Sequence, residues 1–379
     1  MNSEIKSKKV NHDNTDWKES PYLILKGFLM GSADIVPGVS GGTMALITGI
    51  YQRLIYAIKS VDTKAVKSLF TLRVQRFFEY LHWKFLLLLF TGIILAIIFF
   101  TRVVPLQVYM FTHPELIYGL FFGLILGSVF LLLAELDESD RKWRSLLPLF
   151  AGAAIGFWVV TLVPADTPET FWYVFISGAV AICAMILPGI SGSYILLIFR
   201  KYDYVLAQLG AIGSPETGQA ILNIIPFALG AIVGLMLFSR LLSWLLDRYY
   251  AITLLVLIGF LLGSLYVIWP YQDREFEEMV RSSEVLPADH PRVQEISEQG
   301  MDPNLPRYER VAERFEDEGG SELVVIETVS RKLVSSTPLS PWDDEPAGEL
   351  KTVEGILGII GGLLLIIGIA YLRKASPNR

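Results

Sequence analysis

Six long apolar stretches dominate this chain and are separated by polar, charged connections. They run over residues 85–100, 116–134, 146–163, 221–238, 251–270 and 353–370. Each comes near the roughly 20 residues that a helix needs to cross the hydrocarbon core of a bilayer. A single such stretch could be the core helix of a soluble protein, but six of them predict an all-α polytopic membrane protein.

Two further apolar stretches, 21–58 and 171–206, carry the same short interruption near their centres. Pro37-Gly38-Val39-Ser40-Gly41 recurs as Pro188-Gly189-Ile190-Ser191-Gly192, and a tyrosine follows at the same offset, as Tyr51 and Tyr202. Proline removes a backbone donor and glycine weakens a helix, so Pro37, Gly38, Pro188 and Gly189 predict two helix breaks.

Other matches follow the two breaks in the same order, which indicates that a whole unit is duplicated. Gly92 and 100–102 (Phe-Thr-Arg) correspond to Gly230 and 238–240 (Phe-Ser-Arg), and then 126–128 corresponds to 262–264, Leu-Gly-Ser in both. The glycine four residues before each Leu-Gly-Ser glycine, Gly123 or Gly259, completes a Gly-x-x-x-Gly spacing that favours close helix packing.

Loop charge predicts how the two units lie in the membrane. If each broken segment turns back on itself, the first twenty residues and the loop 52–84 lie on one side, and both are rich in Lys and Arg. The positive-inside rule places that side in the cytosol. Each unit then has three crossings, an odd number, so the second unit is inverted. We therefore expect two inverted repeats, each a re-entrant broken helix hairpin plus three transmembrane helices.

The resulting domain plan has five parts. Residues 1–20 form a cytosolic N-terminal tail, 21–163 the first membrane repeat, 171–270 plus 353–372 the second repeat, 271–349 an acidic extracytoplasmic insertion and 373–379 a cytosolic tail. Because the first twenty residues are polar, no cleavable signal peptide is expected. The predicted location is the bacterial cytoplasmic membrane, with both termini cytosolic.

Charge is distributed very unevenly along the chain. Only 18% of residues are charged, against roughly 25% in soluble domains. Residues 271–349 nevertheless hold 20 acidic and 8 basic residues, so the remainder of the chain is mildly basic. The composition of this insertion is typical of a partly disordered segment, apart from a strand-like run at 322–334. It is either a passive insertion or a site for an extracytoplasmic partner.

Few residues could support metal or cofactor chemistry. The chain has one cysteine, Cys183, in an apolar stretch, and four scattered histidines, so neither a disulfide framework nor a metal centre is expected. No Walker loop, Gly-x-Ser-x-Gly elbow or paired-histidine phosphatase pattern occurs in the apolar body. We expect no cofactor, and a transporter rather than an enzyme.

The two breaks are the strongest candidates for a binding site. Backbone groups freed by a break cannot face hydrocarbon, so both breaks must be buried in protein or line a watery cavity. A new half-helix opening after each break would present free N–H groups to a phosphate or carboxylate; the residues concerned are Ser40, Gly41, Gly42, Thr43, Ser191, Gly192 and Ser193. The alternative is that the breaks only kink and pack two helices.

Five ionisable residues near the breaks or near span ends complete the candidate set. Arg53, Arg102, Arg200 and Arg240 could meet a phosphate, since arginine binds phosphate bidentately, or could extend to lipid headgroups. Asp34 lies in an apolar setting three residues before Pro37, and Met185 occupies its place in the second copy. Asp34 could carry a coupling proton or cation, or act only as a cap at the break.

The run from Gly31 to Thr43, Gly-Ser-Ala-Asp-Ile-Val-Pro-Gly-Val-Ser-Gly-Gly-Thr, together with 187–193, Leu-Pro-Gly-Ile-Ser-Gly-Ser, resembles the bacterial polyprenyl-phosphate translocases, formerly a family of unknown function. The resemblance covers about residues 22–371, and the acidic insertion departs from the shorter family pattern. It implies that undecaprenyl phosphate is returned from the outer to the inner leaflet, and that Ser40, Gly41, Gly42, Ser191 and Gly192 hold the headgroup. Tyr194 in place of Thr43 makes the two breaks chemically unequal.

Three other functions remain open on the sequence. A membrane-embedded lipid phosphatase or transferase could use Asp34, or Glu115 with His113. A transporter of a small soluble anion would need the same anion site without an opening to lipid. A scaffold could recruit wall enzymes through the insertion.

Overall fold

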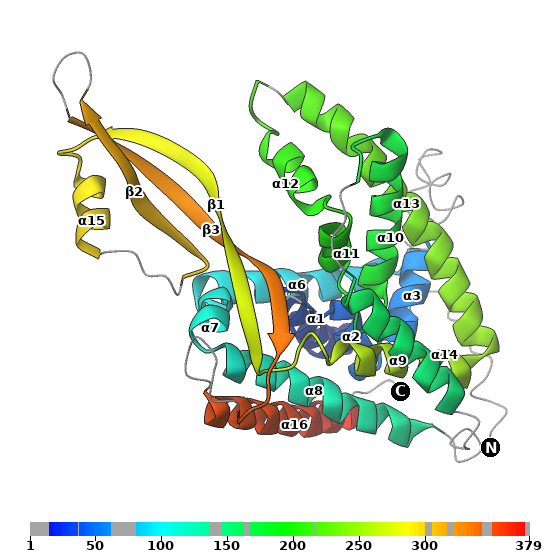
Figure 1. The fold of residues 1–379 in the computed structure, drawn as a ribbon. Helices are drawn as coiled ribbons and strands as arrows, with labels where there is room; N and C mark the ends of the chain where they lie inside the picture. Colours follow the sequence, from blue (N-terminus) through cyan, green and yellow to red (C-terminus); the bar gives the residue numbers. More distant parts are fainter. Residues whose placement is uncertain are drawn as a thin grey trace.

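The computed structural model describes residues 15–36, 38–61, 81–136, 146–162, 167–215, 217–299, 305–316, 322–342 and 351–375 (Figure 1). Pro37, both chain ends and most of the basic loop after residue 61 lie outside the described residues. The first half of the chain forms η2 (Trp17–Glu19), α1 (Ser20–Asp34), α2 (Gly41–Ile47), α3 (Tyr51–Lys59), α6 (Trp83–Arg102), α7 (Leu106–Thr112), α8 (Pro114–Glu135) and α9 (Leu146–Val160).

The second half forms a similar series of helices before the insertion, without a counterpart of α7. It forms α10 (Phe171–Ile186), α11 (Gly192–Ile198), α12 (Tyr202–Gly210), α13 (Thr217–Arg248) and α14 (Tyr250–Ser264), and α16 (Thr352–Ala375) follows the insertion. All six apolar stretches expected from the sequence are helical over most of their length. In the described part of the chain α6, α8, α13 and α16 are long and apolar enough to cross a membrane, whereas α9, α10 and α14 are shorter apolar helices. The chain is thus a mostly helical, polytopic membrane protein.

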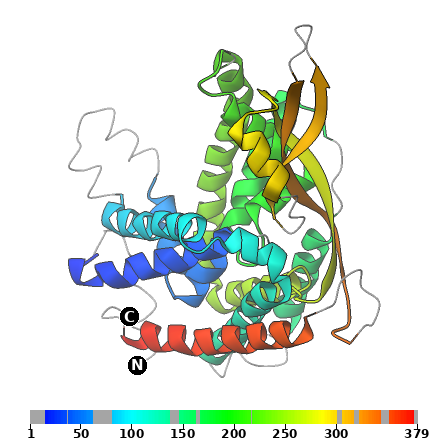
Figure 2. The same ribbon diagram turned by 90° about the vertical axis from the view of Figure 1, so that its left-hand side faces the viewer.

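Four helix pairs build the helical body. In the first half α1 packs along α6, and in the second half α10 packs along α13. The other two pairs join the halves, since α8 packs along α16 and α9 along α14; α8 and α16 lie side by side in Figures 1 and 2. The glycine spacing serves this packing, because a Cβ at Gly123 would lie 2.1 Å from the carbonyl oxygen of Ile359 in α16.

The insertion folds into a three-stranded antiparallel sheet with one helix against it. Strands β1 (Gln272–Pro287), β3 (Glu322–Pro338) and β2 (Arg307–Glu316) lie in the order β1-β3-β2, and α15 (Pro291–Gln299) covers them. The expected strand at 322–334 is confirmed within β3. The expected all-α fold is wrong for the insertion, because β1 and β2 both pair with β3 and Val293 of α15 buries a small core with Val324 and Ile326 of β3.

The sheet extends away from the helical body and is attached at its base (Figures 1 and 2). The rings of Phe276 in β1 and Phe111 in α7 lie 4.9 Å apart. Nearby, the Arg274 guanidinium lies over the ring of Tyr118 in α8, 4.3 Å from its centroid. These contacts attach the start of β1 to α7 and α8.

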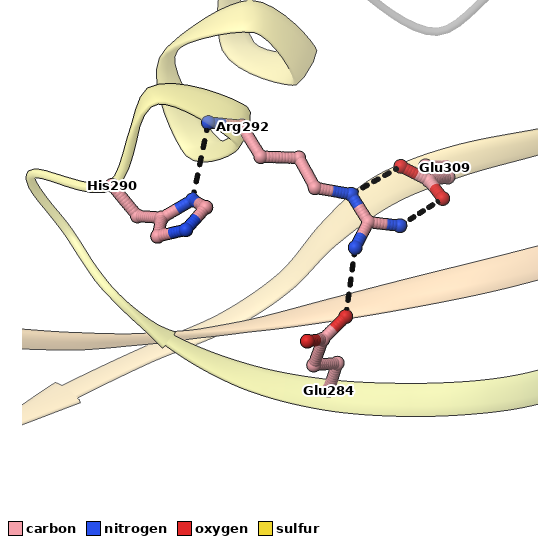
Figure 3. Close-up of polar contacts among 4 residues, drawn as sticks. All are labelled: Glu284, His290, Arg292 and Glu309. Carbon is pink, nitrogen blue, oxygen red and sulfur yellow. Dashed lines mark hydrogen bonds and ion pairs between the residues drawn. The ribbon is translucent and has the colours of Figure 1, made fainter.

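One arginine ties α15 to two strands (Figure 3). Arg292 donates through Nε and Nη2 to the two carboxylate oxygens of Glu309, at 3.2 and 2.5 Å, and through Nη1 to Glu284 at 2.8 Å. A bidentate arginine–carboxylate pair combines charge with fixed geometry. The hydrogen bonds that Arg292 donates to Glu309, and the negative charge of Glu309, raise the pKa of Arg292 above its ordinary value.

Replacing Arg292 by alanine is expected to loosen α15 from the sheet without disturbing the helical body. Backbone amides of α15 should exchange with deuterium faster in Arg292→Ala than in the wild type, whereas those of α8 and α16 should not change. Arg307→Ala removes an exposed arginine at the start of β2 and serves as the matched control. Equal exchange in α15 for the two variants would contradict this role for Arg292.

Candidate functional site: two helix breaks in contact

The first break separates α1 from α2. Helix α1 ends at Asp34, Gly38 adopts a left-handed φ of +86°, and α2 begins at Gly41 after an extended Ser40. Two side chains satisfy the first amides of α2: the Gly41 N–H donates to Asp34 Oδ1 at 2.6 Å, and the Gly42 N–H donates to Ser40 Oγ at 3.2 Å. Asp34 therefore caps the half-helix that follows the break.

The second break has the same backbone shape and different polar contacts. Helix α10 ends at Ile186, Gly189 adopts a φ of +80°, and α11 begins at Gly192 after an extended Ser191. The Ser191 side chain makes no cap and instead shares a hydrogen bond of 2.8 Å with Ser193. Met185 takes the position that Asp34 has in the first copy, and its side chain has no oxygen that could accept a hydrogen bond from the Gly192 N–H.

The backbone match continues past the half-helices. Helices α2 and α11 have 7 residues each, and α3 and α12 have 9 each. The turn after α2 uses Gly49 at a φ of +75°, and the turn after α11 uses Arg200 at a φ of +48°. Left-handed conformation is uncommon in a residue with a side chain, so Arg200 retains the shape that Gly49 adopts freely.

The two breaks touch each other through hydrogen bonds. The Gly189 N–H donates to Thr43 Oγ1 at 3.0 Å, and Ser40 Oγ lies 3.3 Å from the carbonyl oxygen of Met185. The buried Tyr51 hydroxyl donates to the carbonyl oxygen of Ile186, the last residue of α10, at 3.1 Å. Side chains of the first unit thus satisfy backbone groups of α10 and the break that follows it.

The breaks differ in their access to the surface. Every residue of α2 is buried, including Gly41, Gly42 and Thr43. At the second break Ser191 and Gly192 are partly exposed and Ser193 is exposed. The predicted binding residues therefore form one enclosed group and one accessible group in direct contact.

The four candidate arginines lie on α3, α6, α13 and the turn after α11, outside the two breaks themselves. Arg53 forms an ion pair of 3.0 Å with Glu19, donates to Thr15 and stacks over Phe85, so its guanidinium is engaged at the start of α1. Arg102 ends α6 and Arg240 lies within α13, both exposed. Arg200 is exposed on the turn between α11 and α12. Their contact with a phosphate remains a prediction.

Comparison with known proteins identifies the family. Residues 30–285 match the family model described as VCA0040-like, undecaprenyl phosphate translocase-like. A protein of Vibrio cholerae named polyprenyl-phosphate transporter is 41% identical over 263 residues, which cover 69% of this chain and 82% of that protein. The chain belongs to the undecaprenyl phosphate translocase-like family. A Staphylococcus aureus protein of the same name is 31% identical over 65% of this chain and 85% of its own length.

Membership in the translocase-like family bears directly on the two breaks, because residues 30–285 contain both of them. The match ends within β1, so β2, β3 and α16 lie beyond it. No solved structure matches the chain.

Sequence reasoning missed Tyr51 as part of the contact between the two breaks. Its hydroxyl reaches Ile186, 135 residues away in the chain, and no local pattern predicts such a partner. The available signal was its recurrence as Tyr202, which marked the repeat without revealing the contact.

Proposed function

We propose that this chain is a flippase that returns undecaprenyl phosphate from the outer to the inner leaflet of a bacterial cytoplasmic membrane. Related proteins are named polyprenyl-phosphate transporters, which supports the lipid class. The observation that carries the proposal is the direct contact of the two helix breaks. Two interrupted helices that meet inside a membrane protein are the arrangement in which transporters commonly hold substrate.

The proposed substrate has two parts with opposite requirements. Its phosphate needs polar groups shielded from hydrocarbon. The Gly41 and Gly42 amides are already capped, so the groups proposed to bind the phosphate in this conformation are the Ser191 and Ser193 hydroxyls and the first amides of α11, which no side chain caps. Its prenyl chain is as apolar as the lipid tails and needs only a lateral opening. Because Ser191, Gly192 and Ser193 are accessible and α2 is enclosed, the phosphate engages the second break first in this conformation.

We further propose that the two halves are inverted repeats with re-entrant breaks, with both termini in the cytosol. The matched helix pairs support the repeat, since α1 with α6 corresponds to α10 with α13, and α8 with α16 corresponds to α14 with α9. This topology places the acidic sheet on the extracytoplasmic side, where the carrier lipid of wall polymers is released.

The lipid phosphatase alternative has little geometric support. The residues considered for it were Asp34, or Glu115 with His113. The His113 ring contacts Glu354 of α16, where Nδ1 lies 3.0 Å from the carboxylate. Asp34 accepts a hydrogen bond from the Gly41 N–H within the first break. The cellular depletion test described next distinguishes a flippase from a small-anion transporter and from a scaffold.

The cellular test depletes the protein from bacteria that lack other translocases for this lipid. An impermeant probe that binds polyprenyl phosphate then reports the pool facing outward. We expect that pool to grow severalfold, and to return to its normal level when the wild-type gene is restored. An unchanged outer pool would contradict the proposed direction, and a pool that is rescued equally by a chain lacking the sheet would exclude the scaffold.

Asp34 is proposed to couple transport to a proton or another cation. Asp34→Asn retains an oxygen that can accept from the Gly41 N–H but never ionises, so we expect a folded protein with impaired transport that no longer responds to external pH. Asp289→Asn, in the insertion, is the matched control. A variant at position 34 with wild-type rate and pH profile would leave Asp34 as a cap alone.

A further inference from the structure

Three positions carry a hydroxyl in both copies of the broken segment. Counted from the break, Ser40 corresponds to Ser191, Thr43 to Tyr194 and Tyr51 to Tyr202. The side chains change in size while the hydroxyl is retained. The three residues of the first copy are buried, where a hydroxyl is costly unless it is bonded, whereas the three of the second copy are partly exposed.

Only the first copy uses its three hydroxyls on the other break. Ser40, Thr43 and Tyr51 all bond to backbone groups between Met185 and Gly189. In the second copy the Tyr194 hydroxyl donates to the carbonyl oxygen of Val160 at the end of α9.

The other two hydroxyls of the second copy also stay away from the first break. Ser191 bonds to Ser193, and Tyr202 makes no hydrogen bond within the described part of the chain. The contact between the breaks is therefore one-sided.

The helices that follow the half-helices show the same asymmetry. Helix α3 is held against α13, because Lys59 Nζ donates to Ser243 Oγ at 2.8 Å and the Tyr56 hydroxyl donates to Asp247. The corresponding pair would be α12 and α6. Over the described residues these two helices form no extended contact, and Figure 1 shows α12 well apart from α6.

Helix α12 is held elsewhere. The Tyr204 hydroxyl donates to the carbonyl oxygen of Asn223 near the start of α13 at 3.2 Å, and Asp203 lies 4.0 Å from Arg281 of β1. The first-copy hairpin is thus closed on its partner helix and the second-copy hairpin is open.

We propose that this structure is one of two end states. Here the Tyr51 hydroxyl bonds to the backbone at the second break, and in the other state the Tyr202 hydroxyl makes the corresponding bond to the first break. In that second state Tyr202 and Ser191 bond to the backbone of the first break, α12 closes on α6, and α3 separates from α13. The inference rests on the proposed flippase function, and it assigns the exchange between the two states to named hydroxyl groups.

The exchange explains why both copies keep the same hydroxyls. An unbonded polar group at a break is costly in a membrane protein, so each state needs its own hydroxyl partners for the backbone groups that it encloses. The three hydroxyls of the first copy bond to the second break in this state, and the hydroxyls of the second copy are available to the first break in the other state. Removing one hydroxyl is then expected to shift the balance between states by roughly fivefold, as for a buried neutral hydrogen bond.

Cross-linking reports the balance without any substrate. In a Cys183→Ser background, Lys59→Cys with Ser243→Cys marks the state seen here, and the pair leaves Tyr56 and Asp247 in place. Gly210→Cys with Pro105→Cys marks the opposite state, because these positions correspond to Lys59 and Ser243 in the repeat. A short bifunctional thiol reagent is applied to the purified protein in liposomes, and the rate of cross-linking is measured.

Tyr51→Phe should slow the first cross-link and speed the second, and Tyr202→Phe should do the reverse, each by roughly fivefold. Tyr109→Phe, an exposed tyrosine of α7, should change neither rate. If both substitutions shift the rates in the same direction, or if Tyr202→Phe has no effect, the proposal is overturned. Tyr202→Phe decides the matter alone if Tyr51→Phe does not fold.

The same experiment separates this inference from the identity of the cargo. A shift in the predicted directions together with a failure to move polyprenyl phosphate would retain the two states and reject the proposed substrate. Transport of polyprenyl phosphate with no shift in the cross-linking rates would retain the proposed substrate and reject the exchange of hydroxyls between two states.

Discussion

Gly42→Ala is expected to lower transport about tenfold while the protein still inserts in the membrane. A Cβ at this position would lie 2.7 Å from the carbonyl oxygen of Ile186, a backbone atom of the other break that cannot rotate away. Overpacking of this kind costs on the order of 1–3 kcal/mol, and about 1.4 kcal/mol corresponds to a factor of ten. The measurement is the initial rate of polyprenyl phosphate transfer in liposomes at equal protein content.

The control for this substitution is Gly368→Ala in α16, where a Cβ would meet nothing within 4 Å. Alanine is a better helix former than glycine by about 1 kcal/mol, so the control should be neutral or slightly stabilising. Equal rates for the two variants would show that the close approach of α2 to Ile186 has no part in transport.

Gly230→Ala is expected to have the largest effect on folding. Gly230 of α13 lies against α10, and a Cβ there would lie 1.9 Å from the carbonyl oxygen of Phe175. Relief requires α10 and α13 to separate, and α10 leads directly into the second break. We expect the melting temperature of the detergent-solubilised protein to fall by on the order of 5 °C or more, with loss of transport.

Gly218→Ala provides the matched control within the same helix. A Cβ at Gly218 meets nothing within 4 Å, so alanine should raise or maintain the melting temperature there. A fall of similar size in both variants would mean that helix flexibility, rather than the contact with Phe175, sets the stability of α13.

The breaks could be predicted from sequence because their causes are local. Proline and glycine act on their own turn of helix, and the left-handed φ of Gly38 and Gly189 follows from residue type. The duplication was equally visible, since it depends on order and spacing alone.

Other parts of the site depend on contacts distant in the chain. Arg53 looked available to a phosphate because its partner, Glu19, lies 34 residues earlier. The sequence left Asp34 as either an ion-coupling residue or a cap, and the hydrogen bond from the Gly41 N–H to Asp34 across the break shows the cap.

The sheet was missed for a related reason. Strand β1 is rich in glutamate and lacks a regular alternation of apolar and polar residues. Its stability comes from antiparallel pairing with β3, which runs from the pair Gln272 and Pro338 to the pair Pro287 and Leu323. Strand preference depends strongly on such neighbours. Only the apolar run in β3 was strong enough to indicate a strand alone.

The central claim is that the paired breaks move a lipid phosphate across the bilayer. The most direct test places purified protein in liposomes whose outer leaflet contains labelled undecaprenyl phosphate, and follows the loss of label accessible to an impermeant reagent. We predict faster loss with the wild-type protein than with protein-free or Gly42→Ala liposomes, and no release of inorganic phosphate. Loss of label at the protein-free rate would contradict the account.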